Sequence, residues 1–90
     1  MLEKQIEKKV KEYARSRGWA AYKFVSPNNR GVSDCIMFKD SQTVFIEFKQ
    51  KGKKPTKLQE KFLAKMDDQG FITAVIDSIE GGKEFVDALS

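Results

Sequence analysis

Three charged side chains stand where they could act together on one phosphate group. Asp34 begins a short apolar run, and Glu47 and Lys49 lie on either side of Phe48 in the next apolar run. Carboxylate oxygens are the ligands that a hard divalent cation such as Mg²⁺ prefers. A lysine beside such a cation can hold an attacking water or offset the charge that develops on phosphorus. Two acids and a lysine in this order therefore indicate metal-assisted hydrolysis of a phosphodiester bond.

The elements that must position these residues are two strands and the turn between them. Residues 34–38 and 43–49 are apolar runs typical of strands, and Lys39-Asp40-Ser41-Gln42 predicts a short turn. Alternation along the second strand places Phe45, Glu47 and Lys49 on the same face. Glu47 therefore occupies a strand position at which burial is expected.

The register of this hairpin decides whether the two acids meet. If the turn is centred between Asp40 and Ser41, Asp34 lies directly opposite Glu47 on one face. Opposed Cβ atoms are roughly 4.5–5.5 Å apart, and like charges there repel each other. The pair is costly unless a cation lies between the two carboxylates. A shift of one residue would instead turn Asp34 to the other face.

The remaining chain predicts helices and strands around the hairpin. Residues 2–17 carry an apolar stripe at helical spacing and end before Gly18, and residues 19–25 and 71–76 are predicted strands. Thr56-Lys57-Leu58-Gln59 matches a capping box. It opens a helix that ends at Gly70 and whose buried stripe is Leu58, Phe62 and Met66, and residues 83–89 form a short closing helix. The order α-β-β-β-α-β-α predicts an α/β fold in which helices flank a central mixed sheet.

Length and composition limit the kind of protein. Ninety residues suit one domain, 1–90, and a domain this small buries little surface, so self-association would help it. There is no histidine, which excludes histidine acid–base chemistry and Cys/His zinc sites. The single cysteine, Cys35, cannot form an internal disulfide and is expected to be a small buried hydrophobe, as Trp19 and Tyr22 are expected in the core. No apolar run approaches the ~18 residues of a membrane span, so a cytoplasmic protein is expected.

The net charge of +4 suits a polyanionic partner, and the basic residues are not spread evenly. One group follows Glu47 and another studs the first helix. The candidates for phosphate contacts near the acids are Arg30, Lys51, Lys53, Lys54 and Lys57. Each could instead be a solvated surface charge, but beside a catalytic site they would add salt-sensitive affinity for DNA.

These motifs carry a resemblance. Asp34 followed by Glu47-Phe48-Lys49 resembles the D…(D/E)-x-K signature of the PD-(D/E)XK nuclease superfamily. Gly31-Val32-Ser33-Asp34, the run from Val44 to Lys49, and Thr56 with Gln59 extend it, so that nearly the whole chain resembles the VRR-NUC family and its small stand-alone viral-type members. That family usually has G-V-P-D. Ser33 stands here in place of the proline, which is not a ligand.

The resemblance implies a restriction-endonuclease-like fold and a role for each matching residue. Asp34, Glu47 and the Ile46 carbonyl match metal ligands, Lys49 matches the catalytic lysine, and Gln59 matches a glutamine that approaches the site. The family also places a glutamate on the first helix, for which Glu3 and Glu7 compete. Glu3 is favoured because it falls inside the apolar stripe. Two alternatives stay open: Gln59 could serve only the capping box, and Glu3 only the helix dipole.

The function implied by the resemblance is a structure-specific DNA endonuclease that depends on Mg²⁺ or Mn²⁺. Small members of this kind act as homodimers on four-way (Holliday) junctions, and a compact protein of this kind suits a phage. Cleavage of flaps or plain duplex is an alternative within the enzyme class. A catalytically silent nucleic-acid-binding module is another, and so is a partner protein that merely uses a basic face. Loss of an acid or of the lysine would mark the silent module, and all three are present.

Overall fold

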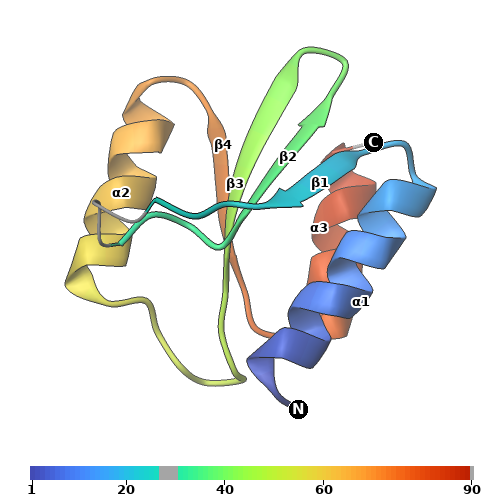
Figure 1. The fold of residues 1–90 in the computed structure, drawn as a ribbon, viewed down its shortest axis with the longest axis horizontal. Helices are drawn as coiled ribbons and strands as arrows, with labels where there is room; N and C mark the ends of the chain where they lie inside the picture. The colour runs from blue at the N-terminus through green and yellow to red at the C-terminus, as the bar shows by residue number, and fades with distance from the viewer. Residues whose placement is uncertain (27–30, 90) are drawn as a thin grey trace.

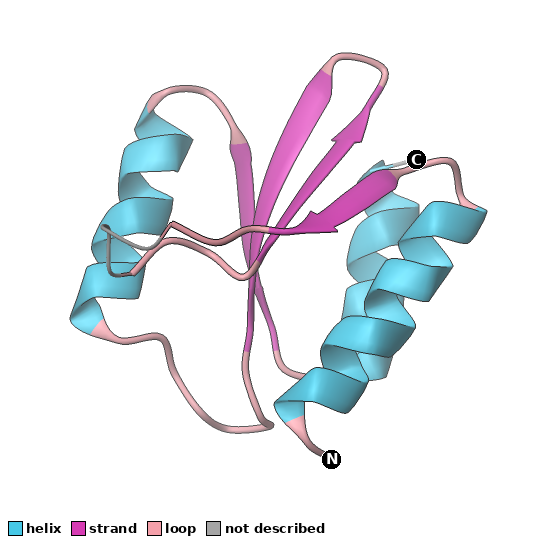
Figure 2. Cartoon of the chain, viewed as in Figure 1, coloured by secondary structure: helices cyan, strands magenta, loops and turns pink. Residues whose placement is uncertain are grey.

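The computed structural model describes residues 1–26 and 31–89. Its elements follow in the order α1 (Glu3–Ser16), β1 (Ala20–Lys23), β2 (Cys35–Lys39), β3 (Gln42–Phe48), α2 (Lys57–Asp68), β4 (Ile72–Ile76) and α3 (Ile79–Leu89). The strands form one sheet in the order β1-β2-β3-β4, in which only β3 and β4 are parallel. The predicted α-β-β-β-α-β-α order and mixed sheet are confirmed (Figure 2).

Helices cover both faces of the sheet (Figure 1). On one face, α1 and α3 pack beside each other over a core of fully buried side chains that includes Val10, Val44, Ile46 and Phe48. Burying each such side chain stabilises the fold by roughly 1.5–3 kcal/mol. Gly82 lets α3 approach α1 closely, because a Cβ there would overlap the Val10 side chain.

The other face carries an aromatic cluster under α2. The Phe45 ring lies 5.9 Å from Phe24, 5.5 Å from Phe62 and 5.6 Å from Phe71, measured between ring centroids. Phe45 and Glu47 thus belong to the α2 face of β3, as the alternation predicts, while Ile46 and Phe48 belong to the opposite core.

The β2–β3 hairpin has the predicted register. Cys35 pairs with Ile46 and Lys39 with Gln42, so the turn is centred between Asp40 and Ser41. These two residues have φ values of 49° and 67°. Positive φ at both central positions is the geometry of a type I′ turn, whose twist matches that of the flanking strands. The turn fixes the register and, with it, the position of Asp34 relative to Glu47.

Two predicted boundaries are wrong. β1 ends at Lys23 and not at Val25, although the Phe24 N–H still donates to the Asp34 carbonyl at 2.8 Å. The last helix begins at Ile79, four residues before the predicted Lys83. Glycines are poor helix formers, so Gly81 and Gly82 disfavour the first turn of this helix. The Ser78 hydroxyl offsets this by accepting a hydrogen bond from the Gly81 N–H at 2.9 Å, as an N-cap does.

Two predicted core assignments are also wrong. Tyr22 is 59% exposed and Leu58 is 49% exposed, whereas Leu63 is the buried residue of α2. The common cause is that, of the described strands, α2 packs only on β3 and β4. The part of the same sheet face that β1 and β2 form is left uncovered by this helix. Trp19, by contrast, is buried as predicted.

Cys35 is fully buried, and burial raises the pKa of its thiol to about 11, so it behaves as a small hydrophobe. Within residues 1–26 and 31–89, no helix is long and apolar enough to cross a membrane.

The hairpin turn predicts a stabilising substitution. Because Ser41 has a φ of 67°, Ser41→Gly should raise the free energy of unfolding by about 0.5–1 kcal/mol, after the entropic cost of glycine is subtracted. Urea denaturation measures the change. Ser41→Ala keeps the Cβ and the strain, and it should therefore show no gain. Equal stabilisation by both variants would contradict the turn geometry.

Candidate active site

The charged residues gather where β2 begins and β3 ends. Asp34 directly precedes β2, Glu47 is the penultimate residue of β3, and Lys49 directly follows it. The Lys49 N–H donates to the Ile76 carbonyl at 2.9 Å, so the strand pairing holds its backbone. The first turns of α1 and α2 lie toward this same end of the sheet (Figure 1). Their N-terminal dipole ends favour negative charge there.

Three carboxylates from three segments converge. One oxygen each of Glu3, Asp34 and Glu47 lies within 4.8 Å of the others. Glu7, the competitor of Glu3, lies elsewhere: its carboxylate pairs with the Lys11 ammonium at 3.3 Å. Of the two glutamates, only Glu3 thus reaches the other acids. Its place in the apolar stripe predicts that it faces the sheet.

Glu47 is buried to an extent that is unusual for an acid, with 1% of its surface exposed. Its Oε2 accepts a hydrogen bond from Gln59 Nε2 at 3.0 Å and lies 3.6 Å from Lys49 Nζ. Its Oε1 is buried and has no hydrogen-bond partner among the described residues. A buried oxygen without a partner costs free energy, and a cation bound to it would remove that cost.

The surroundings of Glu47 disfavour its charged form. Burial has the largest effect, the neighbouring Asp34 carboxyl adds to it, and Lys49 opposes both; together they raise the pKa of Glu47 to about 8. Opposed carboxylates repel in a low-dielectric interior, so one of them keeps its proton unless positive charge is added. A divalent cation is the kind of charge that would hold both acids ionised.

Asp34 is fixed by the backbone of the neighbouring strand. Its Oδ2 accepts a hydrogen bond from the Phe48 N–H at 2.9 Å. The loop before it lies against α2, because a Cβ on Gly31 would fall 2.7 Å from the Leu58 backbone. Gly31 also has a φ of 84°, a backbone conformation that residues other than glycine rarely adopt. The position of the Asp34 loop therefore depends on glycine at residue 31.

Gln59 makes both of the contacts that its position in the sequence allows. Its Oε1 accepts from the Thr56 N–H at 2.8 Å, and its backbone N–H donates to Thr56 Oγ1 at 3.2 Å, which completes the predicted capping box. Its Nε2 is then free to donate to Glu47. The cap orients the amide so that its donor points toward the acidic cluster.

The other predicted residues surround this centre. Ile46 is buried in β3 directly before Glu47 and pairs with Cys35 and Ala74. The loop between β3 and α2 carries the exposed basic residues Lys51, Lys53 and Lys54, and exposed Lys57 is the first residue of α2. Arg30 lies outside the described residues.

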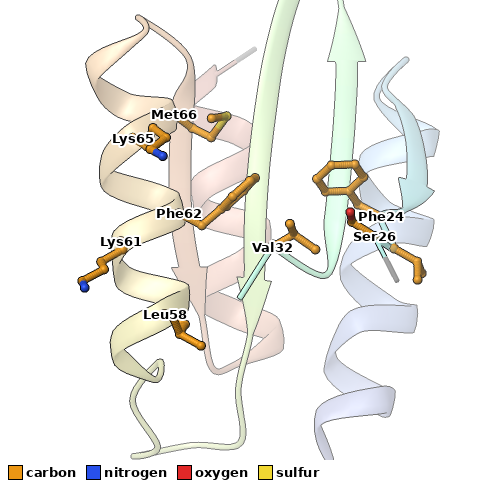
Figure 3. Close-up of a pocket in the computed structure, with 9 residues that line it drawn as sticks. Phe24, Ser26, Val32, Leu58, Lys61, Phe62, Lys65 and Met66 are labelled. Atoms are coloured by element: carbon orange, nitrogen blue, oxygen red, sulfur yellow. The ribbon is translucent and has the colours of Figure 1, made fainter. Parts of the chain in front are cut away.

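A separate hollow does not contain these groups. It is an apolar groove of about 580 Å³ between α2 and the chain around Phe24, with Lys61 and Lys65 at its margin (Figure 3). Phe62 and Met66 of α2 face it, and neither the three acids nor Lys49 line it. The chemistry therefore belongs to the acidic cluster, and the groove is a separate apolar surface.

The donor set fits a divalent metal. Three carboxylates offer hard oxygen ligands, one of them a buried oxygen without a partner, and one lysine supplies the only ion pair of Glu47 among the described residues. Cysteine and histidine are absent from this cluster, which disfavours zinc.

Comparison with known proteins agrees with this geometry. The chain is 39% identical over 77 residues to "Putative nuclease p44" of Acyrthosiphon pisum secondary endosymbiont phage 1, covering 84% of this chain and 83% of that protein. One solved structure described as a VRR_NUC domain superposes with a TM-score of 0.89 at 19% identity, over 98% of this chain and 97% of that one. A second, a VRR_NUC domain protein, gives a TM-score of 0.79 at 13% identity, over 97% of this chain and 86% of that one. No family model matches the chain.

The fold, the two acids followed by a lysine and the likeness to a phage nuclease together identify a nuclease of the PD-(D/E)XK class. Within that class, the chain belongs to the VRR-NUC family, as a small viral-type member.

The raised pKa of Glu47 predicts a pH-dependent stability without metal. A carboxyl whose pKa is higher in the folded than in the unfolded state stabilises the fold below the unfolded value of about 4.5, and this contribution is lost as pH rises toward about 8. In EDTA, the wild type should therefore lose more stability between pH 5 and 8.5 than Glu47→Gln, by at least about 1 kcal/mol, the equivalent of roughly one pKa unit.

Urea denaturation at the two pH values measures this difference. Glu60→Gln removes an exposed carboxylate of α2 and should behave as the wild type does. Adding Mg²⁺ at pH 8.5 should stabilise the wild type but not Glu47→Gln. Parallel pH profiles for the wild type and Glu47→Gln would show that the buried carboxyl does not titrate as described.

Proposed function

We propose that residues 1–90 act as one VRR-NUC nuclease domain, a metal-dependent DNA endonuclease that hydrolyses phosphodiester bonds. The observation that carries the proposal is the convergence of Glu3, Asp34 and Glu47 within 4.8 Å, with Lys49 Nζ 3.6 Å from Glu47. Neither a silent binding module nor a partner protein needs an acid that is 1% exposed beside two others. A nuclease needs this arrangement, because it places negative ligands and a lysine around one point.

Asp34 and Glu47 are the proposed metal ligands, with Glu3 and the Ile46 carbonyl as further ones. A bound Mg²⁺ or Mn²⁺ supplies Lewis-acid activation of the water and of the phosphate. The protein holds the ligands in place beforehand: the Phe48 N–H fixes Asp34, and Gln59 fixes Glu47. Ligands that are fixed in advance lose little entropy when the cation and the substrate bind.

Lys49 is the proposed catalytic lysine. Its backbone is held by β4, its side chain is 17% exposed, and its ammonium group lies beside Glu47. From there it can donate to a phosphate oxygen and offset negative charge as the bond from water oxygen to phosphorus forms and the bond to the leaving sugar oxygen breaks. Gln59 is a positioning residue in this scheme, since its contact is with Glu47.

The exposed lysines after β3 are proposed to hold the DNA backbone near the cluster. The loop that leaves the site carries Lys51, Lys53 and Lys54, and Lys57 begins α2. Arg30 is proposed to join them. Contacts of this kind position the duplex without reading its sequence. They make binding sensitive to salt.

Branched DNA, in particular the four-way junction, is the proposed substrate, and the proposed active form is a homodimer. A two-fold dimer presents two sites to two strands of a two-fold symmetric junction. The relative named above belongs to a phage, which supports a role in phage DNA processing in the host cytoplasm. Cleavage of flaps or of plain duplex is the competing specificity.

A surface suited to dimerisation is present. The open side of the sheet carries Tyr22 and Phe38, which are 59% and 41% exposed and whose rings lie 6.4 Å apart. The apolar groove is lined by Phe24, two residues after Tyr22, and by exposed Leu58. Contiguous exposed apolar surface of this kind usually marks an interface.

The cleavage prediction uses end-labelled four-way junction, flap and linear duplex DNA with Mg²⁺, Mn²⁺ or EDTA. The wild type should make paired symmetric cuts in the junction only with metal. Asp34→Asn, Glu47→Gln and Lys49→Met should each lower the rate by about 100-fold or more, since each removes a group that stabilises the transition state. Asp67→Asn, an exposed acid at the end of α2, should cut as the wild type does.

Each other outcome decides a different part of the proposal. Equal cutting of all three substrates would leave the enzyme and remove the junction specificity. Junction binding without cutting in either metal would establish the silent module.

The dimer prediction is tested by sedimentation. Tyr22→Asp places a charge on the open sheet face and should convert a wild-type dimer into a monomer at micromolar concentration, because an unpaired charge in an interface is costly. Lys83→Asp on α3, away from that face, should remain dimeric. A monomeric wild type would contradict the homodimer.

A further inference from the structure

A charged hollow, separate from the apolar groove, lies between α1 and β1. It has a volume of about 250 Å³ and is lined only by charged side chains, namely Lys4, Glu7, Lys8, Lys11 and Lys23. Four lysines against one glutamate make it a cationic site in the free protein. None of these residues belongs to the proposed metal site or to the lysine loop after β3.

The acid of the hollow is already neutralised. Glu7 pairs with Lys11 at 3.3 Å, and both side chains are largely sheltered, at 14% and 15% exposed. No ion pair within residues 1–26 and 31–89 engages Lys4, Lys8 or Lys23. The charge that remains for a ligand is therefore positive.

Two residues of the hollow are neighbours in the chain of residues that belong to the acidic cluster or contact it. Lys4 follows Glu3 of the cluster directly in α1. Lys23 precedes Phe24, whose N–H donates to the Asp34 carbonyl at 2.8 Å. The hollow thus lies beside the cluster, on the α1 side. The lysine loop after β3 leaves the cluster on the α2 side (Figure 1).

The spacing suits the backbone of one nucleic-acid strand. Glu3, Glu7 and Lys11 succeed one another every four residues of α1, a rise of about 6 Å at about 1.5 Å per residue. Along the axis of the duplex, each DNA strand presents a phosphate about every 3.4 Å. A strand whose scissile phosphate lies at the cluster would therefore carry the next one to three phosphates past the hollow. Lysine ammonium groups bind such phosphates as point charges.

We propose that this hollow binds the backbone phosphates of the cleaved DNA strand next to the scissile bond. The inference rests on the proposed function, because it takes the acidic cluster as the point of cleavage. With the loop after β3, it holds the strand on both sides of that point. The ligand is a phosphodiester backbone, and the contact is independent of base sequence.

The test compares neighbouring lysines of one helix. Lys8→Ala and the double variant Lys4→Ala/Lys8→Ala remove exposed side chains of the hollow. Lys9→Ala is the matched control, since Lys9 is the next residue, is 60% exposed and pairs with Glu12 outside the hollow. Equilibrium binding to four-way junction and duplex DNA is measured in EDTA over a series of salt concentrations, and single-turnover cleavage is measured with Mg²⁺.

Lys8→Ala should weaken binding about 5-fold and the double variant about 10-fold or more, and the slope of log K against log salt should fall by about 0.9 per lysine removed. The maximal cleavage rate should stay within two-fold of the wild type, because these lysines do not touch the reacting atoms. Lys8→Arg should restore binding, and Lys9→Ala should have no effect. Wild-type affinity and salt slope in the double variant, or equal losses in Lys9→Ala, would overturn the inference.

A neutral methylphosphonate at single positions of the strand locates the contact. Substitution one to three nucleotides from the cut should weaken binding by the wild type but not by the double variant. Equal penalties for both proteins would overturn the inference. The binding measurements do not depend on cleavage. A protein that cuts no DNA would therefore refute the proposed function, while the affinities of the lysine variants would still show whether the hollow binds DNA.

Discussion

The repulsion between Glu47 and the acids around it is the constraint on which the rest of the structure depends. A carboxylate that is 1% exposed in a central strand loses nearly all hydration, and Asp34 and Glu3 add like charge within 4.8 Å. The fold offsets only part of this cost. Lys49 lies 3.6 Å away, Gln59 donates one hydrogen bond, and Oε1 has no partner among the described residues. The uncompensated charge lowers the stability of the free protein and favours the proposed cation, which is the usual relation between strain and function.

The secondary structure around the site serves to hold that arrangement. The type I′ turn sets the β2–β3 register, and the register places Asp34 beside Glu47. Gly31 then lets the Asp34 loop lie against the first turn of α2, so that the loop and Gln59 keep a fixed relation. The capping box orients the Gln59 amide. Each device is local, yet together they bring groups from three distant parts of the chain to one point.

Much of this could be predicted from the sequence, because the determining interactions are local or periodic. Glu47 between Ile46 and Phe48 marks an acid in a buried strand, and the polar turn gives the register without any structure. The capping box requires only Thr56 and Gln59 at the right spacing. The angle of Glu3 around α1 also favours it over Glu7. The angle alone does not say whether the start of α1 lies near the end of β3. The packing of α1 on the sheet brings Glu3 to the other acids.

The failures arise where tertiary packing decides burial. Tyr22 and Leu58 have apolar side chains at strand or helix positions, but α2 covers only β3 and β4, and the sequence holds no sign of that limit. The early start of α3 has a local cause, the Ser78 hydroxyl that accepts from the Gly81 N–H, whereas the close approach of Gly82 to Val10 joins residues far apart in the chain. The hollow on α1 could not be found either. Its lysines are indistinguishable in sequence from Lys9, and only the approach of β1 brings Lys23 to Lys4 and Lys8.

The distribution of charge resolves an apparent contradiction in the proposed function, in which polyanionic DNA must reach three carboxylates. Exposed acids would repel the phosphate, but Glu47 is buried, Glu3 and Asp34 are half-buried, and the exposed charges on either side are lysines. Long-range attraction therefore comes from the basic surface, with a net charge of +4, while the negative charge acts only at short range. A divalent cation between the carboxylates would reverse even that short-range repulsion. Capture of DNA and its chemistry are thus assigned to different residues, so that losing a surface lysine should affect affinity, whereas losing an acid should affect the rate.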